Sequence, residues 1–171
     1  HIGPFTFSAG RLFLGFFTLL PIFLIFELRK VKKIKLNYKV FIYFVIISFL
    51  LSYGNSLQQF ALLLTDVANA AVYTVLYVVI VPFVAYFFFS KNTHWSVWPA
   101  VLICIVGGLL LTELDNVSVR TGDAIAVFNA FFWAFHIVFI SRFLRIFNFP
   151  ITIATFQCLI AGIFAFIPSL V

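Results

Sequence analysis

Hydrophobic residues in this chain gather in six long runs, separated by short polar gaps. The runs cover residues 4–26, 40–64, 68–89, 97–111, 124–143 and 151–171. Most are close to the ~20 residues that a helix needs to cross the ~30 Å hydrocarbon layer of a bilayer. Backbone polar groups find no water there, so each run is expected to be a helix that satisfies them internally. The pattern predicts an all-α, polytopic membrane protein with six transmembrane helices, the fourth being the shortest.

Polar residues and prolines indicate where some of these helices begin or bend. Asp66 falls at the end of the second run and is expected to N-cap the third helix, making a tight hairpin of the two. Gly122 and Asp123 mark the start of the fifth helix. Pro82 lies inside the third run. It is expected to kink that helix and is the candidate hinge of a gate.

The positive charges fall in alternate gaps between the runs. Nine of the eleven Lys and Arg residues lie in the first, third and fifth gaps or at their edge, six of them between residues 29 and 39. Positive residues in short loops stay on the cytoplasmic side, so the odd gaps are predicted to face the cytoplasm and both ends of this chain the outside. The multi-pass protein is expected in the cell inner (plasma) membrane.

Composition excludes several other classes of protein. The chain is 64% hydrophobic and 9% charged, with a mean hydropathy of +1.19, so lipid must be its solvent. The net charge of +6 is explained by topology and indicates membrane lipids, not nucleic acid, as partners. Cys104 and Cys158 lie inside apolar runs, so no disulfide framework, metal site or cofactor is predicted. The chain starts with His1 and contains no Met, which we interpret as part of a longer protein.

Polar side chains inside the helices are the best pointers to a solute pathway, because they are costly in lipid. On the second helix, Ser48, Ser52, Asn55 and Gln59 recur at steps of four, three and four, which places them on one face. Similar stripes comprise Asn69, Tyr73 and Tyr77 on the third helix, and Asn129, Trp133 and His136 on the fifth. Any one stripe is explained by hydrogen bonds between helices. Three together favour a shared polar cavity.

Two ionisable residues each allow two interpretations of their role. Arg11 either reaches the outer interface with its long side chain or contacts an anion in the cavity. His136 is the mid-helix residue whose unperturbed pKa lies near neutrality, which makes it a conceivable proton carrier, but a neutral, hydrogen-bonded histidine packed between helices is the preferred interpretation. No Asp or Glu lies well inside a run, which argues against exchange of lipophilic cations for protons on a buried carboxylate.

The first and sixth runs resemble each other. The shared features at identical spacing are Pro4 and Pro150, Thr6 and Thr152, and Arg11 and Gln157; after a one-residue shift, Gly15 aligns with Gly162 and Pro21 with Pro168. The two runs lie five crossings apart and are therefore predicted to cross the membrane in opposite directions. A repeat of this kind is an inverted repeat, which many secondary transporters use to alternate access.

Four segments carry a family resemblance by their order and spacing: GPFTFSAGRLFLGFFTLLPIF, YGNSLQQFALLLTDVANAAVYTVLYVVIVPFVAYFFF, WPAVLICIVGGLLL and GDAIAVFNAFFWAFHIVFISRF. Together they resemble the EamA-like group of the drug/metabolite transporter (DMT) superfamily over essentially the whole chain. The resemblance implies a bundle of ten helices made of two inverted five-helix repeats around a central cavity. Residues 1–114 would hold four helices of the first repeat, and residues 122–171 the first two helices of the second. One helix would precede His1 and three would follow Val171.

The resemblance also implies which residues lie near the cavity. These are Arg11, Asn55, Gln59, Asn69, Tyr73, Trp133, His136 and Gln157, and the stripe on the third helix adds Tyr77. One feature departs from the family. Its members often carry a Glu just after the fourth helix, where this chain reads Phe-Phe-Ser-Lys-Asn over residues 88–92, so a function tied to that Glu is unsupported.

The sequence thus favours a secondary transporter, not an enzyme, that moves a small polar metabolite such as an amino acid or nucleotide-like compound. Coupling to protons or to a counter-solute is compatible with this hypothesis. A membrane-embedded enzyme acting on lipid-linked substrates is the first alternative, but it needs clustered His, Asp or Glu, and His94 and His136 stand alone. A noncatalytic membrane subunit is the second, and it would need no polar stripes.

Overall fold

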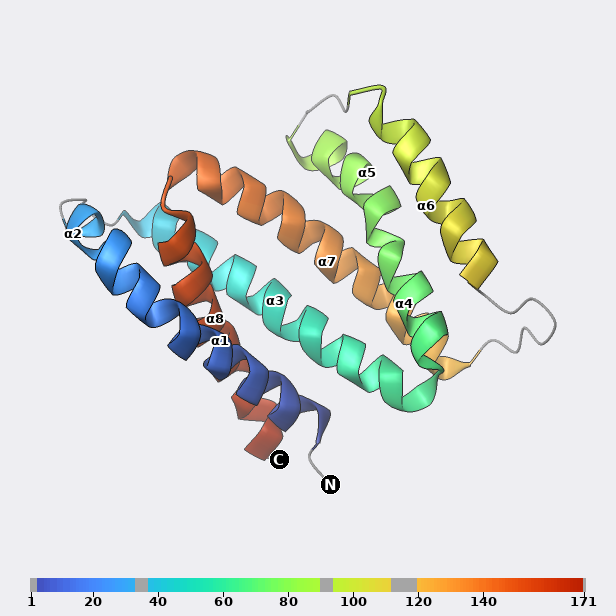
Figure 1. The fold of residues 1–171 in the computed structure, drawn as a ribbon, viewed down its shortest axis with the longest axis horizontal. Coiled ribbons are helices and arrows are strands. Elements are labelled where there is room, and N and C mark those ends of the chain that lie inside the picture. The colour runs from blue at the N-terminus through green and yellow to red at the C-terminus, as the bar shows by residue number, and fades with distance from the viewer. Residues whose placement is uncertain (1–2, 33–36, 90–93, 112–119, 171) are drawn as a thin grey trace. The chain divides into compact units, whose positions relative to one another are not determined.

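The computed structural model describes residues 3–32, 37–89, 94–111 and 120–170, and all regular structure in these ranges is helical (Figure 1). The helices are α1 (Pro4–Phe26), α2 (Leu28–Val31), α3 (Tyr38–Leu64), α4 (Val67–Val75), α5 (Tyr77–Phe89), α6 (Val97–Leu111), α7 (Thr121–Ile146) and α8 (Pro150–Phe166), followed by the 3-10 helix η2 (Ile167–Leu170). The predicted all-α class is confirmed over the described residues.

Five helical stretches are long and apolar enough to cross a membrane: Pro4–Phe26, Tyr38–Leu64, Val67–Phe88, Thr121–Ile146 and Pro150–Leu170. They match five of the six predicted spans. The remaining predicted span is the fourth run, which forms α6. This helix has 15 residues, and at ~1.5 Å per residue it is shorter than the ~30 Å hydrocarbon layer. It stays a predicted crossing.

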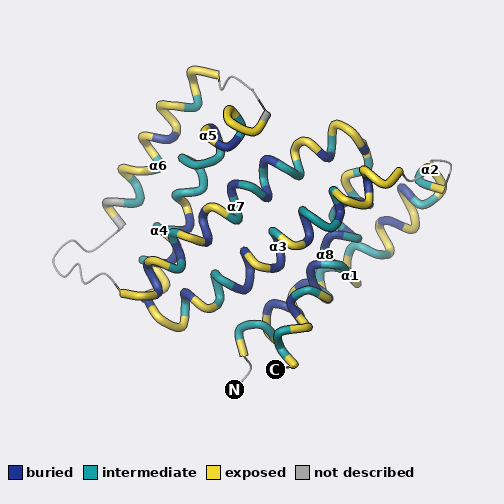
Figure 2. Tube along the Cα trace, turned by 180° about the vertical axis from the view of Figure 1, so that it is seen from behind, coloured by how far each residue is buried: buried dark blue, intermediate teal, exposed yellow. Residues whose placement is uncertain are grey.

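Large apolar side chains remain exposed along the long helices, as Figure 2 shows by the recurrence of exposed positions. Leu14 is 69% exposed, Ile25 73% and Phe87 76%. A soluble protein rarely leaves apolar surface of this extent open to water. The outward faces of these helices are therefore made for lipid.

The chain divides into two compact units. Unit 1 comprises His1–Ser56 and Phe139–Val171, which includes α1, α2, most of α3, the end of α7, α8 and η2. Unit 2 comprises Leu57–Val138, which includes the end of α3, then α4, α5 and α6, and most of α7. Each unit has its own packing and is described separately.

In unit 1, α1 and α8 pack along each other in opposite directions (Figure 1). Phe13, early in α1, lies against Gly162, late in α8: a Cβ added to that glycine would come 3.1 Å from the Phe13 ring. Further along α1, the ring of Phe23 meets that of Phe156 edge-on, with centroids 5.3 Å apart. Later residues of α1 therefore contact earlier residues of α8. The two helices run in opposite directions, as predicted for the first and sixth runs.

An aromatic cluster forms the core of unit 1 where α3, α7 and α8 meet. Phe143 is fully buried at its centre. Tyr43 stacks on its ring at 5.3 Å, and Phe44 meets it edge-on at 4.9 Å. Aromatic pairs in these geometries add about 0.5–1.5 kcal/mol beyond the area that they bury.

In unit 2, the third predicted span is interrupted at Leu76, where α4 ends and α5 begins. The N–H of Leu76 donates to the carbonyl of Tyr73, three residues back, which replaces the four-residue α-helical step. One turn earlier the hydroxyl of Thr74 donates to the Ala70 carbonyl at 2.7 Å, a contact that often bends helices. Pro82 lies inside α5. The backbone hydrogen bonds thus show an irregularity at Leu76, and the kink expected at Pro82 stays a prediction.

Helix α6 packs on α4, and α5 packs on α7, within unit 2. A Cβ added to Gly108 of α6 would lie 3.2 Å from Val72 of α4, so this glycine permits close contact of the two helices. Val84 of α5 forms a buried apolar cluster with Ala134 and Val138 of α7.

Candidate functional site

The first candidate cluster lies in unit 1 and begins with Arg11. Its guanidinium donates a hydrogen bond to Oδ1 of Asn55 on α3, and its Cζ lies 5.9 Å from the centroid of the Phe7 ring. Arg11 is therefore held against the polar stripe of α3 while part of it stays exposed. A guanidinium fixed in this way keeps further N–H donors for an anionic group such as a carboxylate or phosphate.

The predicted stripe on α3 is a buried face. Ser48 and Ser52 are 0% and 1% exposed, and Asn55 is 6% exposed. Gln59, one step further along the same face, is half-buried and belongs to unit 2. The spacing of these residues in the sequence therefore identified a face of α3 that is buried in the fold.

Three buried polar atoms of unit 1 have no hydrogen-bond partner among the residues that the structure describes. They are the hydroxyls of Ser8 on α1 and Ser48 on α3, and Oε1 of Gln157 on α8. A buried polar atom left without a partner costs about 1–3 kcal/mol, so such atoms are normally satisfied by water or a bound molecule. We call Ser8, Ser48, Ser52, Asn55 and Gln157, together with Arg11, the polar set of unit 1.

The second candidate cluster lies in unit 2 and is aromatic. Trp133 and His136 of α7 meet edge-on, with ring centroids 5.9 Å apart and an interplanar angle of 88°. His136 is 7% exposed, and Asn129 on the same helix is fully buried. Asn69, Tyr73 and Tyr77 are half-buried. Tyr77 also packs on the Val84, Ala134 and Val138 cluster.

A buried carboxylate joins α1 to α8 in unit 1. Glu27 immediately follows α1 and is 7% exposed. One carboxylate oxygen accepts hydrogen bonds from both the N–H (2.6 Å) and the hydroxyl of Thr152, and the other from the N–H of Ile151 at 3.3 Å. These N–H groups belong to the first turn of α8, where unpaired donors and the helix dipole favour a negative charge. We call this contact the Glu27 junction.

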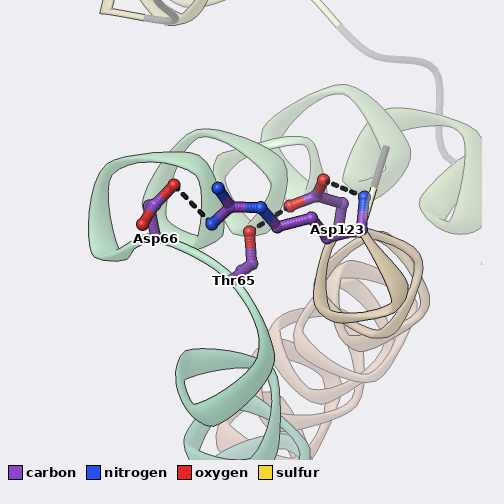
Figure 3. A network of polar contacts seen from close by, with 4 residues as sticks. Thr65, Asp66 and Asp123 are labelled. Carbon is purple, nitrogen blue, oxygen red and sulfur yellow. Dashed lines mark hydrogen bonds and ion pairs between the residues drawn. The ribbon is translucent and has the colours of Figure 1, made fainter. Parts of the chain in front are cut away.

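A second carboxylate junction lies in unit 2, where α3 and α4 meet the start of α7 (Figure 3). Asp123 is 3% exposed; one of its oxygens accepts from the Thr65 hydroxyl and the other from the N–H of Arg120 at 2.8 Å. The guanidinium of Arg120 pairs with Asp66 at 2.6 Å. We call these four residues the Asp123 junction.

The Asp123 junction corrects one prediction from the sequence and confirms another. Asp66 occupies the N-cap position of α4, but its side chain makes no capping hydrogen bond and pairs with Arg120 instead. Gly122 and Asp123 do lie in the first turn of α7. A Cβ on Gly122 would come 2.7 Å from backbone atoms of Leu64 and Thr65, so only glycine lets the two segments approach this closely.

The EamA-like transporter family matches residues 1–113 of the 171, which is about two thirds of the chain and spans α1 to α6. The chain belongs to the EamA-like transporter family. This family is part of the DMT superfamily and consists of membrane transporters, not enzymes. Comparisons with curated proteins and with solved structures gave no match. The protein is therefore a multi-pass membrane transporter.

In this EamA-like chain the structure brings together some of the predicted cavity residues. Arg11 and Asn55 are hydrogen-bonded, and Trp133 contacts His136. Arg11, Asn55 and Gln157 belong to unit 1, whereas Gln59, Asn69, Tyr73, Tyr77, Trp133 and His136 belong to unit 2. A single cavity that collects all nine stays a prediction. Residues 90–92, where the chain departs from the family's usual Glu, lie outside the described residues.

Glu27 and Ser8 of this EamA-like protein are not among the residues that the sequence pattern predicted. The signal for Glu27 was present but weak: it is the one acidic residue in the cationic segment between residues 27 and 39. Ser8 belongs to no stripe, so nothing in the spacing marked it. No group of three or more His, Cys, Asp or Glu residues suited to a metal ion occurs in the part of the chain that the structure describes.

Proposed function

We propose that this protein is a secondary transporter that moves a small polar metabolite, of the amino acid or nucleotide-like class, across the cytoplasmic membrane by alternating access. Family membership supplies the transporter part of the proposal. The observation that supports the solute class is the Arg11–Asn55 pair beside the buried hydroxyls of Ser48 and Ser52. A guanidinium, an amide and hydroxyls suit a solute with an anionic group and further hydrogen-bonding atoms.

The ten-helix inverted-repeat architecture belongs to the same proposal, with residues 1–114 in the first repeat and 122–171 in the second. Three observations support it. Helices α1 and α8 run in opposite directions, and both begin with a proline in the first turn. Their aligned glycines also both face the partner helix, since a Cβ on Gly15 would lie 3.6 Å from Cys158 and one on Gly162 would meet Phe13.

The proposal has three further parts. They are the nine cavity candidates named above, a hinge at Pro82, and coupling of transport to protons through His136 or to a counter-solute. The interruption at Leu76 divides the third span into α4 and α5, and Pro82 lies inside α5, where it removes a backbone donor. This supports a hinge near the middle of that span.

Transport by the full-length protein in liposomes tests the proposal. We expect uptake or counterflow for at least one member of a panel of amino acids, nucleosides and their phosphorylated forms. Arg11→Ala should lower kcat/KM for an anionic substrate by about tenfold or more, because a charge-assisted hydrogen bond is lost. Leu14→Ala, at an exposed apolar position of the same helix, is the matched control and should leave transport unchanged.

Two further variants separate a cavity from packing between helices. Gln59→Ala and Trp133→Ala should slow transport while leaving membrane insertion intact. No transport of any panel member would contradict the proposed function, and normal kinetics in both variants would show that the stripes serve packing alone.

A further inference from the structure

Unit 1 contains a pocket that the transport proposal does not use. It has a volume of about 450 Å³ and lies between α1, α2, the start of α3, the end of α7 and α8. Its walls are mainly apolar and include Phe23, Phe41, Phe44, Phe147, Phe156 and Ile160. The pocket reaches the surface beside Asn37 and Tyr38, which are both exposed, Tyr38 to 74%.

The walls do not suit a polar metabolite. Their polar side chains are those of Asn37, Tyr38 and Thr152. Thr152 is already committed, because its hydroxyl and its N–H both donate to Glu27. Asn37 and Tyr38 stand at the exposed end, so the deeper part offers only apolar contacts. The occupant must therefore be apolar over most of its length.

Exposed cationic residues lie next to lining residues in the sequence. Arg29, Lys30 and Lys32 are exposed on either side of Val31, which lines the pocket, and the exposed Lys39 lies between the lining residues Tyr38 and Val40. On α7, the exposed Arg142 and Arg145 precede the lining residue Phe147. Glu27, the acidic residue of this segment, is occupied by the start of α8. The surroundings therefore attract a negative charge beside an apolar slot.

We propose that this pocket binds an anionic phospholipid, with an acyl chain in the apolar cavity and the phosphate among the cationic residues of α2 and the start of α3. The ends of two apolar spans meet here, which is the depth at which headgroups begin. The same cationic residues predict the cytoplasmic side, whose leaflet carries anionic lipid. The lipid would contact both α2 and α8, and so would reinforce the link that Glu27 makes between the α1 end and α8.

Photo-crosslinking tests this proposal on the full-length protein in nanodiscs. The probes are phosphatidylglycerol and phosphatidylcholine that carry the same photoreactive acyl chain, and mass spectrometry maps the labelled peptides. We expect phosphatidylglycerol to label the peptides that contain Phe41, Phe44 or Ile160 about tenfold more than phosphatidylcholine does, because several positive charges act together.

Variants then separate a built site from the lipid that surrounds any membrane protein. Changing Arg29, Lys30 and Lys32 together to Gln should reduce phosphatidylglycerol labelling to the phosphatidylcholine level, and filling the pocket with Ile160→Trp should reduce labelling by both lipids. Arg120→Gln in unit 2 removes one exposed positive charge elsewhere and should change neither. Equal labelling by the two lipids, labelling that survives the triple change, or labelling that is absent from the pocket peptides would each overturn the proposal.

Discussion

The Glu27 junction and the Asp123 junction use the same chemistry in different surroundings. Each places a carboxylate at the first turn of a helix: Glu27 at α8 and Asp123 at α7. Glu27 is 7% exposed and reaches across 125 residues of sequence. Asp123 lies within its own helix and is supported by an outer ion pair in which Arg120 and Asp66 are 48% and 65% exposed.

The exposure of each charged group decides how much its contacts stabilise the protein. A hydrogen bond to a buried charged group contributes about 1.5–3 kcal/mol, whereas an exposed ion pair contributes about 0–1 kcal/mol. Both junctions therefore rest on a buried carboxylate, Glu27 in unit 1 and Asp123 in unit 2, and the exposed pair of Arg120 and Asp66 adds little. Unit 2 adds a constraint of shape, which is the close approach at Gly122.

The chain supplies a reporter for each unit. Cys158 on α8 and Cys104 on α6 are free and half-buried. With Cys104→Ser as background, the remaining thiol becomes reactive to a dye when unit 1 opens; with Cys158→Ser as background, the other thiol reports on unit 2. These two backgrounds make the stability of each unit measurable by thiol exposure on heating.

The largest effect is expected for Glu27→Ala. It removes the shared acceptor of three hydrogen bonds and should destabilise unit 1 by roughly 2–3 kcal/mol. Thermal exposure of the Cys158 thiol measures the loss. Thr152→Val, which removes only the hydroxyl donor, should cost about 1 kcal/mol. Equal melting of Glu27→Ala and the background protein would contradict a charge-held junction.

Gly122→Ala should be nearly as damaging, in unit 2. The added Cβ would meet backbone atoms at 2.7 Å, which cannot rotate away, so we expect a loss of about 1–3 kcal/mol from strain. The Cys104 thiol is the reporter. Gly107→Ala is the control, because nothing lies within 4 Å of its Cβ position. If both variants melt alike, shape does not hold this junction.

Gly162→Ala tests the packing of α1 on α8 and should have a moderate effect of about 1 kcal/mol. Its Cβ would press on the Phe13 ring at 3.1 Å, and a ring can give way by a few tenths of an ångström. Gly15→Ala makes an ordinary contact of 3.6 Å with Cys158 and should be tolerated. Because Gly15 touches the reporter thiol, circular dichroism should follow melting for this pair. A reversed order would show that the two glycines are not packed as described.

The smallest effect is expected for Arg120→Gln. It breaks the exposed ion pair with Asp66 but keeps the backbone N–H of position 120, which donates a hydrogen bond to Asp123. Unit 2 should therefore lose less than about 1 kcal/mol of stability. The Cys104 thiol and a salt titration measure it. A loss as large as that of Glu27→Ala would remove the contrast between the two junctions.

Local features of the fold were predictable from the sequence. The run at residues 4–26 coincides with α1, and Gly122 with Asp123 correctly placed the start of α7. These features depend on a residue and its near neighbours, such as apolar length and the preference for an acidic residue in a first turn.

Long-range partners were not predictable. Asp66 had the right position for a cap, yet its side chain pairs with Arg120, 54 residues away. The interruption at Leu76 depends on backbone hydrogen bonds that compete closely with the regular helix, so no residue type marks it. For the candidate site, spacing identified Asn55 and the α3 stripe, but the contact with Arg11 joins residues 44 apart in the sequence and arises only in the folded chain.

The Glu27 junction also sets an order of events during synthesis. Ile151 lies 124 residues after Glu27. At a translation rate of about 5–20 residues per second, this carboxylate waits roughly 6–25 s for its partners to be made. Meanwhile α1 must sit in the bilayer without its final neighbour. The nascent protein therefore passes through a period in which an insertase or neighbouring lipid has to shelter α1, so a helix that is made early is fixed in place late.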